Sequence, residues 1–319
     1  MILVTGAANN IGQELVQQLL SAGFSLKLTG SPNDDWSRWE KYSHQIQFVQ
    51  SHILDVTEIY EIVKDVEAVF HCDTINEYQT VSYENRMKYN VEGTANIVNA
   101  MLYHGVKKII FFSSLKAMIS VPNKILDENS KADVNEWTTE FALSMILAER
   151  EIWRGSVEGL DVNIINCADI LVNTTSGKNL YSEAIRNINR GKVEIYPSNI
   201  EYVVVKDVVN LSLKILHGNH WNASWLALGG SINPSRFYQL IANHSSSNWK
   251  PIMMQSHSVY FKRVKDFFKS VLKGKERTFR KANGKFLMTN FQFNNELTTQ
   301  TFEMHWNSIE NWIKQNLRK

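Results

Sequence analysis

Short apolar runs alternate with amphipathic segments through the first 110 residues of the chain. Runs of strand length occur at residues 2–4, 25–29, 46–49, 68–71 and 108–113. Between them, apolar side chains recur at helical spacing, and Gly23 ends the first helical segment; these segments are 13–22, 59–63 and 90–104. Strands separated by helices of this length imply right-handed crossovers, so the pattern predicts an α/β fold with a parallel sheet.

The turn between the first strand and the first helix reads Thr5-Gly6-Ala7-Ala8-Asn9-Asn10-Ile11-Gly12. A turn of this kind lets a pyrophosphate approach the helix N-terminus, where backbone N–H groups are unpaired. We expect Gly6 to form the turn, Gly12 to let helix and strand pack closely, and Asn9 to hold the positive φ where glycine is usual. The predicted cofactor-binding residues here are Gly6, Asn9, Asn10, Ile11 and Gly12. A turn that binds nothing is the alternative.

Composition narrows the class of protein. The chain holds 34 Lys and Arg against 32 Asp and Glu, a balance that gives no sign of a nucleic-acid partner. Cys72 and Cys167 are too few for a disulfide framework or a metal cluster, and they suit a reducing compartment. No basic leader precedes an apolar stretch, and no apolar run reaches the roughly 18 residues of a membrane span. These features predict a soluble cytoplasmic protein without a metal site.

Further motifs follow along the chain, and their order is informative. They are Tyr89-Asn90-Val91-Glu92-Gly93-Thr94-Ala95-Asn96, the strand-like run from Val106 to Ser114, Asp127-Glu128, Ser144 with Glu149, Val205-Lys206-Asp207-Val208-Val209, and Leu226-Ala227-Leu228-Gly229-Gly230. Together with the glycine turn, they resemble the extended short-chain dehydrogenases/reductases of the NAD-dependent epimerase/dehydratase group. Within that group the chain is most similar to the dihydroflavonol-reductase-like branch.

This resemblance implies a Rossmann-type, doubly wound parallel sheet with a smaller C-terminal substrate lobe. Residues 1–170 and 200–230 would form the dinucleotide-binding domain, and residues 171–199 and 231–290 the substrate lobe. Residues 291–319 would be a strand and helix that dock back. A small-molecule ligand would bind in the cleft between the lobes. A homodimer through the helices near residues 88–104 and 138–154 is also implied by the resemblance.

The resemblance assigns roles to several side chains. Ser114 falls on the active-site serine of the group, and Asn90 opens the Asn-x-x-Gly-Thr helix motif. His52 aligns with the residue that meets the adenine. His71 begins a segment that stands where His-x-Ala-Ala is common, although a lone histidine is more often structural. The implied cofactor is NAD or NADP, and Asp73 would lie near its pyrophosphate.

Two positions depart from the group in a way that bears on chemistry. Phe141 and Met145 stand where the group carries Tyr-x-x-x-Lys. In the group, the Tyr phenol transfers a proton, and the Lys lowers its pKa and holds the nicotinamide ribose. Phe141 has no hydroxyl and Met145 has no charge, so we expect this proton relay to be absent.

Three hypotheses follow from these departures. The leading one is an atypical member that binds NAD(P) and serves as a sensor or regulator. The second is an active oxidoreductase, or a nucleotide-sugar epimerase or dehydratase, that uses Ser114 and a further group. The third is a protein-interaction module with an empty cleft. Lys116 is expected to be a solvated loop lysine rather than the further catalytic group.

A basic segment near the C-terminus stands apart from these motifs. Residues 259–285 hold ten Lys and Arg against Asp266 and Glu276. Apolar side chains recur through it at helical spacing, at Phe261, Val264, Phe268, Val271 and Leu272. A basic amphipathic helix can lie on an anionic membrane, but its apolar face more often packs on its own domain. Burial of the stripe, rather than membrane contact, is therefore predicted.

Overall fold

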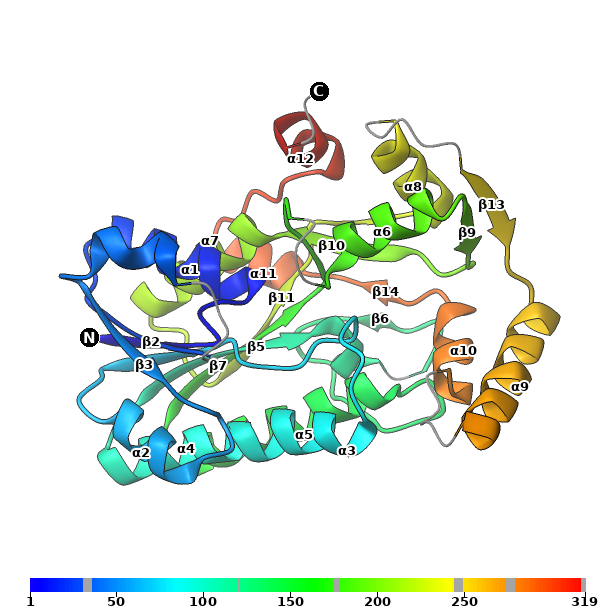
Figure 1. The fold of residues 1–319 in the computed structure, drawn as a ribbon. Helices are drawn as coiled ribbons and strands as arrows, with labels where there is room; N and C mark the ends of the chain where they lie inside the picture. Colours follow the sequence, from blue (N-terminus) through cyan, green and yellow to red (C-terminus); the bar gives the residue numbers. More distant parts are fainter. Residues whose placement is uncertain (31–35, 120, 175–177, 244–248, 274–278, 317–319) are drawn as a thin grey trace.

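The computed structural model describes all residues except 31–35, 120, 175–177, 244–248, 274–278 and 317–319. Its centre is a seven-stranded sheet in the order β11-β7-β5-β4-β1-β2-β3 (Figure 1). The strands are β1 (Ile2–Thr5), β2 (Leu26–Gly30), β3 (Ile46–Gln50), β4 (Ala68–His71), β5 (Lys108–Ser114), β7 (Asp161–Cys167) and β11 (Ala223–Ala227). All six neighbouring pairs run parallel. The predicted parallel α/β sheet is confirmed.

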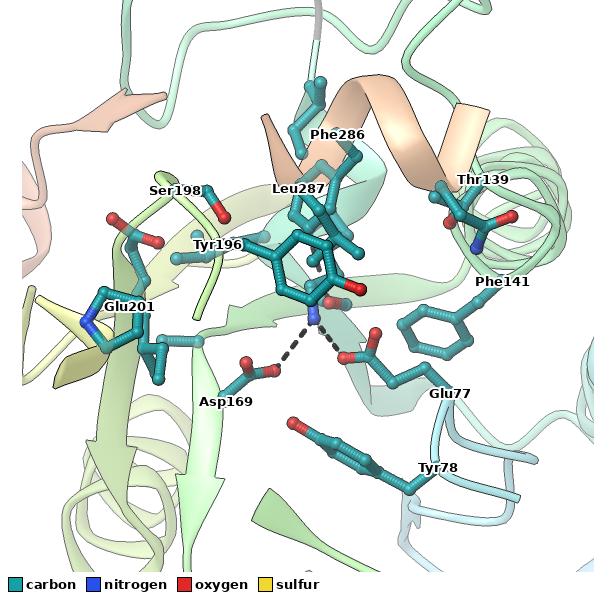
Figure 2. A pocket seen from close by; sticks show the side chains of 18 of the residues that line it. Glu77, Tyr78, Thr139, Phe141, Asp169, Tyr196, Ser198, Glu201, Phe286 and Leu287 are labelled. Carbon is teal, nitrogen blue, oxygen red and sulfur yellow. Dashed lines mark hydrogen bonds and ion pairs between the residues drawn. The ribbon is translucent and has the colours of Figure 1, made fainter. Parts of the chain in front are cut away.

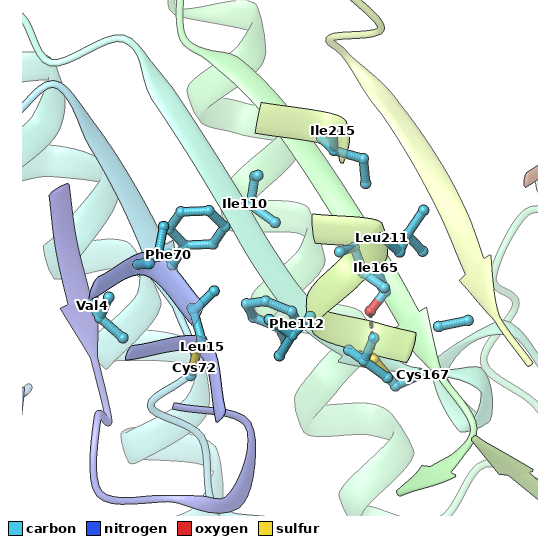
Figure 3. Packing of buried hydrophobic residues seen from close by; sticks show 14 of the residues in the cluster. Val4, Leu15, Phe70, Cys72, Ile110, Phe112, Ile165, Cys167, Leu211 and Ile215 are labelled. Carbon is cyan, nitrogen blue, oxygen red and sulfur yellow. Dashed lines mark hydrogen bonds between the residues drawn. The ribbon is translucent and has the colours of Figure 1, made fainter. Parts of the chain in front are cut away.

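Helices cover both faces of this sheet, which makes it doubly wound. One face carries α1 (Asn10–Ser21) and α7 (Val205–His217), and the other carries α2 (Val56–Val63), α4 (Gly93–His104) and α5 (Glu140–Val157). Figure 3 shows the first face, where Leu15 of α1 and Leu211 of α7 pack toward Phe70, Phe112 and Ile165 of the strands. Because both faces of the sheet are covered, the central residues of β1, β4 and β5 are apolar without alternation.

Two short segments connect β4 to α4. Helix α3 (Tyr83–Met87) is followed by a π-helical turn at Lys88–Glu92, and α4 begins only at Gly93. The sequence predicted one continuous helix from residue 90 to residue 104. In a π-helical turn each hydrogen bond spans one residue more than in an α-helix, and such turns often occur at functional sites. Short 3₁₀ turns occur at Ser37–Tyr42 and at Leu115–Met118.

A second group of elements packs around its own apolar core. It contains a three-stranded sheet of β8 (Asp169–Leu171), β10 (Ile200–Val204) and β12 (Gly230–Ile232), with helices α6 (Leu180–Asn189), α8 (Pro234–Ala242) and α12 (Ile309–Asn316). The strand pair of β9 (Lys192–Ile195) with β13 (Lys250–Met253) adds to this group. The pair of β6 (Ile125–Leu126) with β14 (Gln292–Phe293) packs in a separate small cluster with Ile119 and Phe291. Helix α11 (Glu296–Thr301) returns to the main sheet, because Thr298 Oγ1 accepts a hydrogen bond from the Leu226 backbone of β11.

The basic segment forms α9 (Ser256–Lys273) at the outer edge of the molecule, beside α10 (Lys281–Leu287) (Figure 1). Residues 274–278 of this segment lie outside the described residues. The predicted burial of its apolar stripe is wrong: Phe261, Phe268, Val271 and Leu272 are exposed. Among the described residues, no helix combines the length and the hydropathy needed to cross a membrane.

Candidate functional site

The glycine turn lies at the carboxyl end of β1, and its geometry differs from the prediction at Asn9. Gly6 holds the positive φ, at +63°, whereas Asn9 is extended with a φ of −77°. Asn9 Oδ1 accepts a hydrogen bond of 2.8 Å from the Gly12 backbone N–H, and Asn9 Nδ2 donates one of 2.5 Å to the Cys72 carbonyl. Asn9 is therefore the N-cap of α1, a position that asparagine favours without strain.

Both glycines of the turn are required by close contacts. A Cβ on Gly6 would lie 2.8 Å from Cα of Asp73, and a Cβ on Gly12 would lie 2.7 Å from Cα of Ala7. Gly12 thus lets α1 pack directly on the turn, as predicted. Asn10 is the first residue of α1 and lines a second cavity of about 240 Å³, while Ile11 packs against the main core.

The two predicted histidines occupy different environments. His71 is fully buried, and its ring nitrogens pair with Thr5 Oγ1 at 2.7 Å and with Thr94 Oγ1 at 3.0 Å. Burial lowers the pKa of His71 to about 3, so the ring is neutral. Its side chain is closed to a ligand, and only its backbone could line a cofactor site. His52 is exposed, and its Nδ1 accepts a hydrogen bond from the Leu54 backbone.

Asn90 ties the π-helical turn to both neighbouring segments. Its Oδ1 accepts a hydrogen bond of 2.7 Å from the Ile75 backbone, and its Nδ2 donates one of 3.0 Å to Ser144 Oγ of α5. The Asn90 side chain is fully buried. It therefore fixes the loop after β4 against the helix that carries the dyad positions, rather than presenting an amide to the cleft.

The side chains at the two dyad positions on α5, Phe141 and Met145, lie in different environments. Thr139 caps α5, and Phe141 in its first turn lines the cleft. Met145, one turn further on, is 1% exposed and packs in the core beneath the sheet, with its Sδ 3.7 Å from Asn90 Nδ2. Of the two dyad positions, Phe141 therefore lines the cleft, whereas Met145 lies in the core. An uncharged thioether gains free energy from burial, because it needs no hydration.

The cleft is a cavity of about 1020 Å³ at the carboxyl ends of β5 and β7. Its walls come from both groups of elements, including Ser114 of β5, Phe141 of α5, Tyr196 after β9 and Phe286 of α10. Figure 2 shows Phe141, Tyr78, Glu77 and Asp169 projecting into this space. The predicted location of a ligand cleft therefore agrees with the cavity. Ser114 Oγ accepts a hydrogen bond from the Lys116 backbone at 3.2 Å.

A partly buried charge cluster lies in the cleft wall, and sequence reasoning did not find it. The Lys116 ammonium contacts the carboxylates of Glu77 and of Asp169, the latter at 3.1 Å, as the dashed lines in Figure 2 show. Burial alone would lower the pKa of Lys116, but the two carboxylates outweigh it and hold the pKa above its usual value. The expectation that Lys116 is a solvated loop lysine is wrong, because its side chain is only 14% exposed.

Two carboxyl groups near the cleft have pKa values close to neutrality. Burial raises the pKa of Glu77 to about 7, even though Lys116 opposes the shift. Burial likewise raises the pKa of Glu149 on α5 to about 7, and hydrogen bonds from Ser113 and Asn166 only partly offset it. A group that titrates near neutral pH can either donate or accept a proton. Glu77 lines the cleft, and Glu149 does not appear among the residues that line it.

Arg86 fixes the loop that carries Glu77 into the cleft. Its guanidinium donates hydrogen bonds to the carbonyls of Ile75, Asn76 and Gln79, at 2.6 to 3.0 Å. The same guanidinium lies 5.9 Å from the Phe141 ring. These contacts fix the loop beside Phe141.

Comparison with known proteins identifies the family. Residues 2–223 match the NAD dependent epimerase/dehydratase family. The chain belongs to this family. It is 23% identical over 212 residues to sterol demethylase protein B of Methylococcus capsulatus, and 25% identical over 228 residues to cinnamoyl-CoA reductase 1 of Petunia hybrida. These matches cover 66% and 65% of this chain, but only 64% and 66% of the two relatives, just under two thirds of their length.

Solved structures support the same fold. DesIV, a dTDP-glucose 4,6-dehydratase from Streptomyces venezuelae solved with NAD and TYD bound, gives a TM-score of 0.78 at 15% identity. The superposition covers 99% of this chain and 95% of that chain. The predicted membership of the extended short-chain dehydrogenase/reductase group and the predicted Rossmann-type fold are both confirmed.

Proposed function

We propose that the protein binds NAD or NADP between the glycine turn and the cleft, holds a second small ligand in the cleft, and acts as a sensor or regulator. Family membership and the α1 N-terminus support the dinucleotide. The DesIV structure with NAD bound shares this fold. The observation that supports the regulatory part concerns the dyad positions: Phe141 lines the cleft without a proton to give, and Met145 is buried in the core away from the cleft.

The N-terminus of α1 is already capped by the Asn9 side chain, which lowers the affinity that we expect for a dinucleotide. Asn9 Oδ1 already takes the Gly12 N–H, which a phosphate would otherwise accept from. Asp73, adjacent to Gly6, adds a negative charge at the same edge of the sheet, where it accepts a hydrogen bond from Tyr89. At about 6 Å and an effective dielectric of about 20, two like charges repel by roughly 3 kcal/mol. Weak, micromolar binding of the dinucleotide is therefore expected.

Calorimetric titration with NAD⁺, NADH, NADP⁺ and NADPH tests this proposal. Wild type should bind at least one dinucleotide, and Asn9→Gly combined with Asp73→Ala should bind it at least about tenfold more tightly. Turnover with ketones, alcohols or nucleotide sugars should stay at background. The proposal fails if neither protein binds any of the four dinucleotides. It also fails if wild type turns over substrate faster than ~1 s⁻¹, the lower end of typical enzyme turnover rates.

One observation favours a second candidate, a working oxidoreductase. Glu77 projects into the cleft that Phe141 and Ser114 line, and its pKa of about 7 suits a proton donor. In a reduction, hydride from the dinucleotide would add to a carbonyl carbon while the protonated Glu77 carboxyl supplies the proton to the carbonyl oxygen. Ser114 would hold that oxygen.

The pH profile separates the two candidates. If Glu77 is the donor, reduction should slow as the pH rises through about 7, because the carboxyl loses the proton it must give. Glu77→Gln should then remove both the activity and the pH dependence, while dinucleotide binding persists. Turnover that survives both Glu77→Gln and Ser114→Ala would exclude this candidate and leave the catalytic group elsewhere.

A further inference from the structure

Helix α9 has one face that packs on the molecule. Val259, Lys262 and Asp266 share this face, at the spacing i, i+3, i+7. Val259 packs so closely on Gly284 that an added Cβ there would lie 2.8 Å from it. Lys262 pairs with Glu194, and Asp266 accepts a hydrogen bond of 3.0 Å from the Phe279 backbone. The helix is thus anchored through its polar side.

The apolar stripe lies on the other side of the same helix. The stripe begins with Phe261, Val264 and Phe268, each of which lies two residues after a residue of the packed face. It continues with Val271 and Leu272. Because successive residues are about 100° apart around a helix, a shift of two positions turns this face almost opposite to the first. Phe261 is 67% exposed, Phe268 58%, Val271 64% and Leu272 83%.

The surroundings of the stripe extend it and give it a charge. Strand β13 leads into α9 along the same edge of the molecule (Figure 1), and its Ile252 and Met253 are also exposed. Within α9, Lys262, Arg263, Lys265, Lys269 and Lys273 are basic, and Asp266 is the single acid. Lys265 and Lys269 are themselves exposed. Large apolar side chains on a projecting, convex helix flanked by exposed lysines match the chemistry of an anionic lipid surface.

We propose that α9, together with Ile252 and Met253, is an interfacial element that docks the protein on an anionic membrane. The aromatic and aliphatic side chains of the stripe enter the boundary between headgroups and acyl chains, and the flanking lysines contact the lipid phosphates. A membrane fits better than a protein partner, because the stripe is borne on a projecting helix and needs no matching groove. The proposal does not depend on the dinucleotide or on catalysis.

Vesicle co-sedimentation of the full chain tests the docking surface. Wild type should pellet with vesicles of phosphatidylcholine and phosphatidylserine, and much less with phosphatidylcholine alone or at high salt. Phe268→Ala with Leu272→Ala should lower the partition by about tenfold or more, because two side chains no longer enter the lipid. Lys265→Gln with Lys269→Gln should lower it only for the anionic vesicles.

Matched controls keep the result decisive. Tyr103→Ala removes an aromatic side chain that is 74% exposed on α4, so it should leave vesicle binding unchanged. All variants should keep the wild-type melting temperature, because every altered side chain is exposed. Failure of wild type to bind anionic vesicles at low salt overturns the proposal and leaves an acidic protein partner as the occupant. Binding that is equal for wild type and the Phe268→Ala, Leu272→Ala variant overturns it too.

Discussion

Replacement of Glu149 by glutamine should stabilise the protein at alkaline pH and leave it unchanged in acid. Glu149 is a buried carboxyl whose Oε1 accepts hydrogen bonds from Ser113 and from Asn166. A glutamine oxygen can accept the same two bonds. The substitution therefore keeps the local contacts and removes only the ability to ionise.

The sign and size of the effect follow from the pKa. Burial raises the pKa of Glu149 from an ordinary 4.5 to about 7, so between these values the folded protein holds a proton that the unfolded chain has released. Stability therefore falls as the pH rises from about 4.5 to about 7, and the loss is complete above 7. At about 1.4 kcal/mol for each pKa unit, the full loss is about 3 kcal/mol.

Thermal unfolding of wild type and Glu149→Gln across pH 4 to 8.5 measures this difference. At roughly 2 °C for each kcal/mol, the variant should melt about 6 °C higher at pH 8 and equally at pH 4. Glu158→Gln, at the exposed C-cap of the same helix, removes a surface ion pair with Arg154 and should change stability by less than ~1 kcal/mol. An identical shift at both pH values, or a variant less stable at pH 8, would refute the buried-carboxyl argument.

Three further predictions concern the turn, the dyad and the charge cluster. Gly12→Ala should lower stability by roughly 2–3 kcal/mol and weaken dinucleotide binding, since α1 must move away from Ala7; a variant of wild-type stability would contradict this. Met145→Lys should lower the free energy of unfolding, measured by urea denaturation, by several kcal/mol, because its ammonium would be buried without a partner. Lys116→Met should cost about 3–5 kcal/mol at pH 8 and less at pH 5, where Glu77 can take up a proton because its pKa is raised to about 7.

The fold could be predicted because every local signal agrees with it. Buried parallel strands are continuously apolar, and the intervening helices carry one apolar face, so their alternation specifies the sheet. Gly6 and Gly12 stand where the turn requires them. Helix starts were displaced by a few residues, as at Asn10, because caps depend on side-chain hydrogen bonds that periodicity does not reveal.

The charge cluster could not be predicted from periodicity, because its members are far apart in sequence. Lys116 is 39 residues from Glu77 and 53 from Asp169. A signal was nevertheless present. Glu77, Lys116 and Asp169 each follow the end of one of three adjacent strands, β4, β5 and β7. Carboxyl ends of adjacent parallel strands share one edge, so strand order together with these positions would have brought the three charges together.

The orientation of the apolar stripe of α9 could not be predicted from the sequence, for a different reason. Its apolar period correctly indicated an amphipathic helix, but a period says only that one face is apolar, not which face meets the protein. The orientation is set by Lys262 and Asp266, whose polar contacts with Glu194 and the Phe279 backbone anchor the polar side inward. Such contacts join residues distant in sequence, so a helical period alone could not reveal them.

In helix α5, the side chains that fix the position of the helix differ from those expected to transfer protons. The side chains that position it remain: Thr139 caps it, Ser144 bonds to Asn90, and Glu149 bonds to two strands. An apolar residue in place of Glu149 would avoid the cost of a buried carboxyl, so its presence is not explained by stability alone. Phe141 and Met145 stand at the two positions of this helix where the family resemblance leads us to expect the proton relay. Helix α5 is therefore fixed beside the cleft by contacts that need neither a hydroxyl at Phe141 nor a charge at Met145.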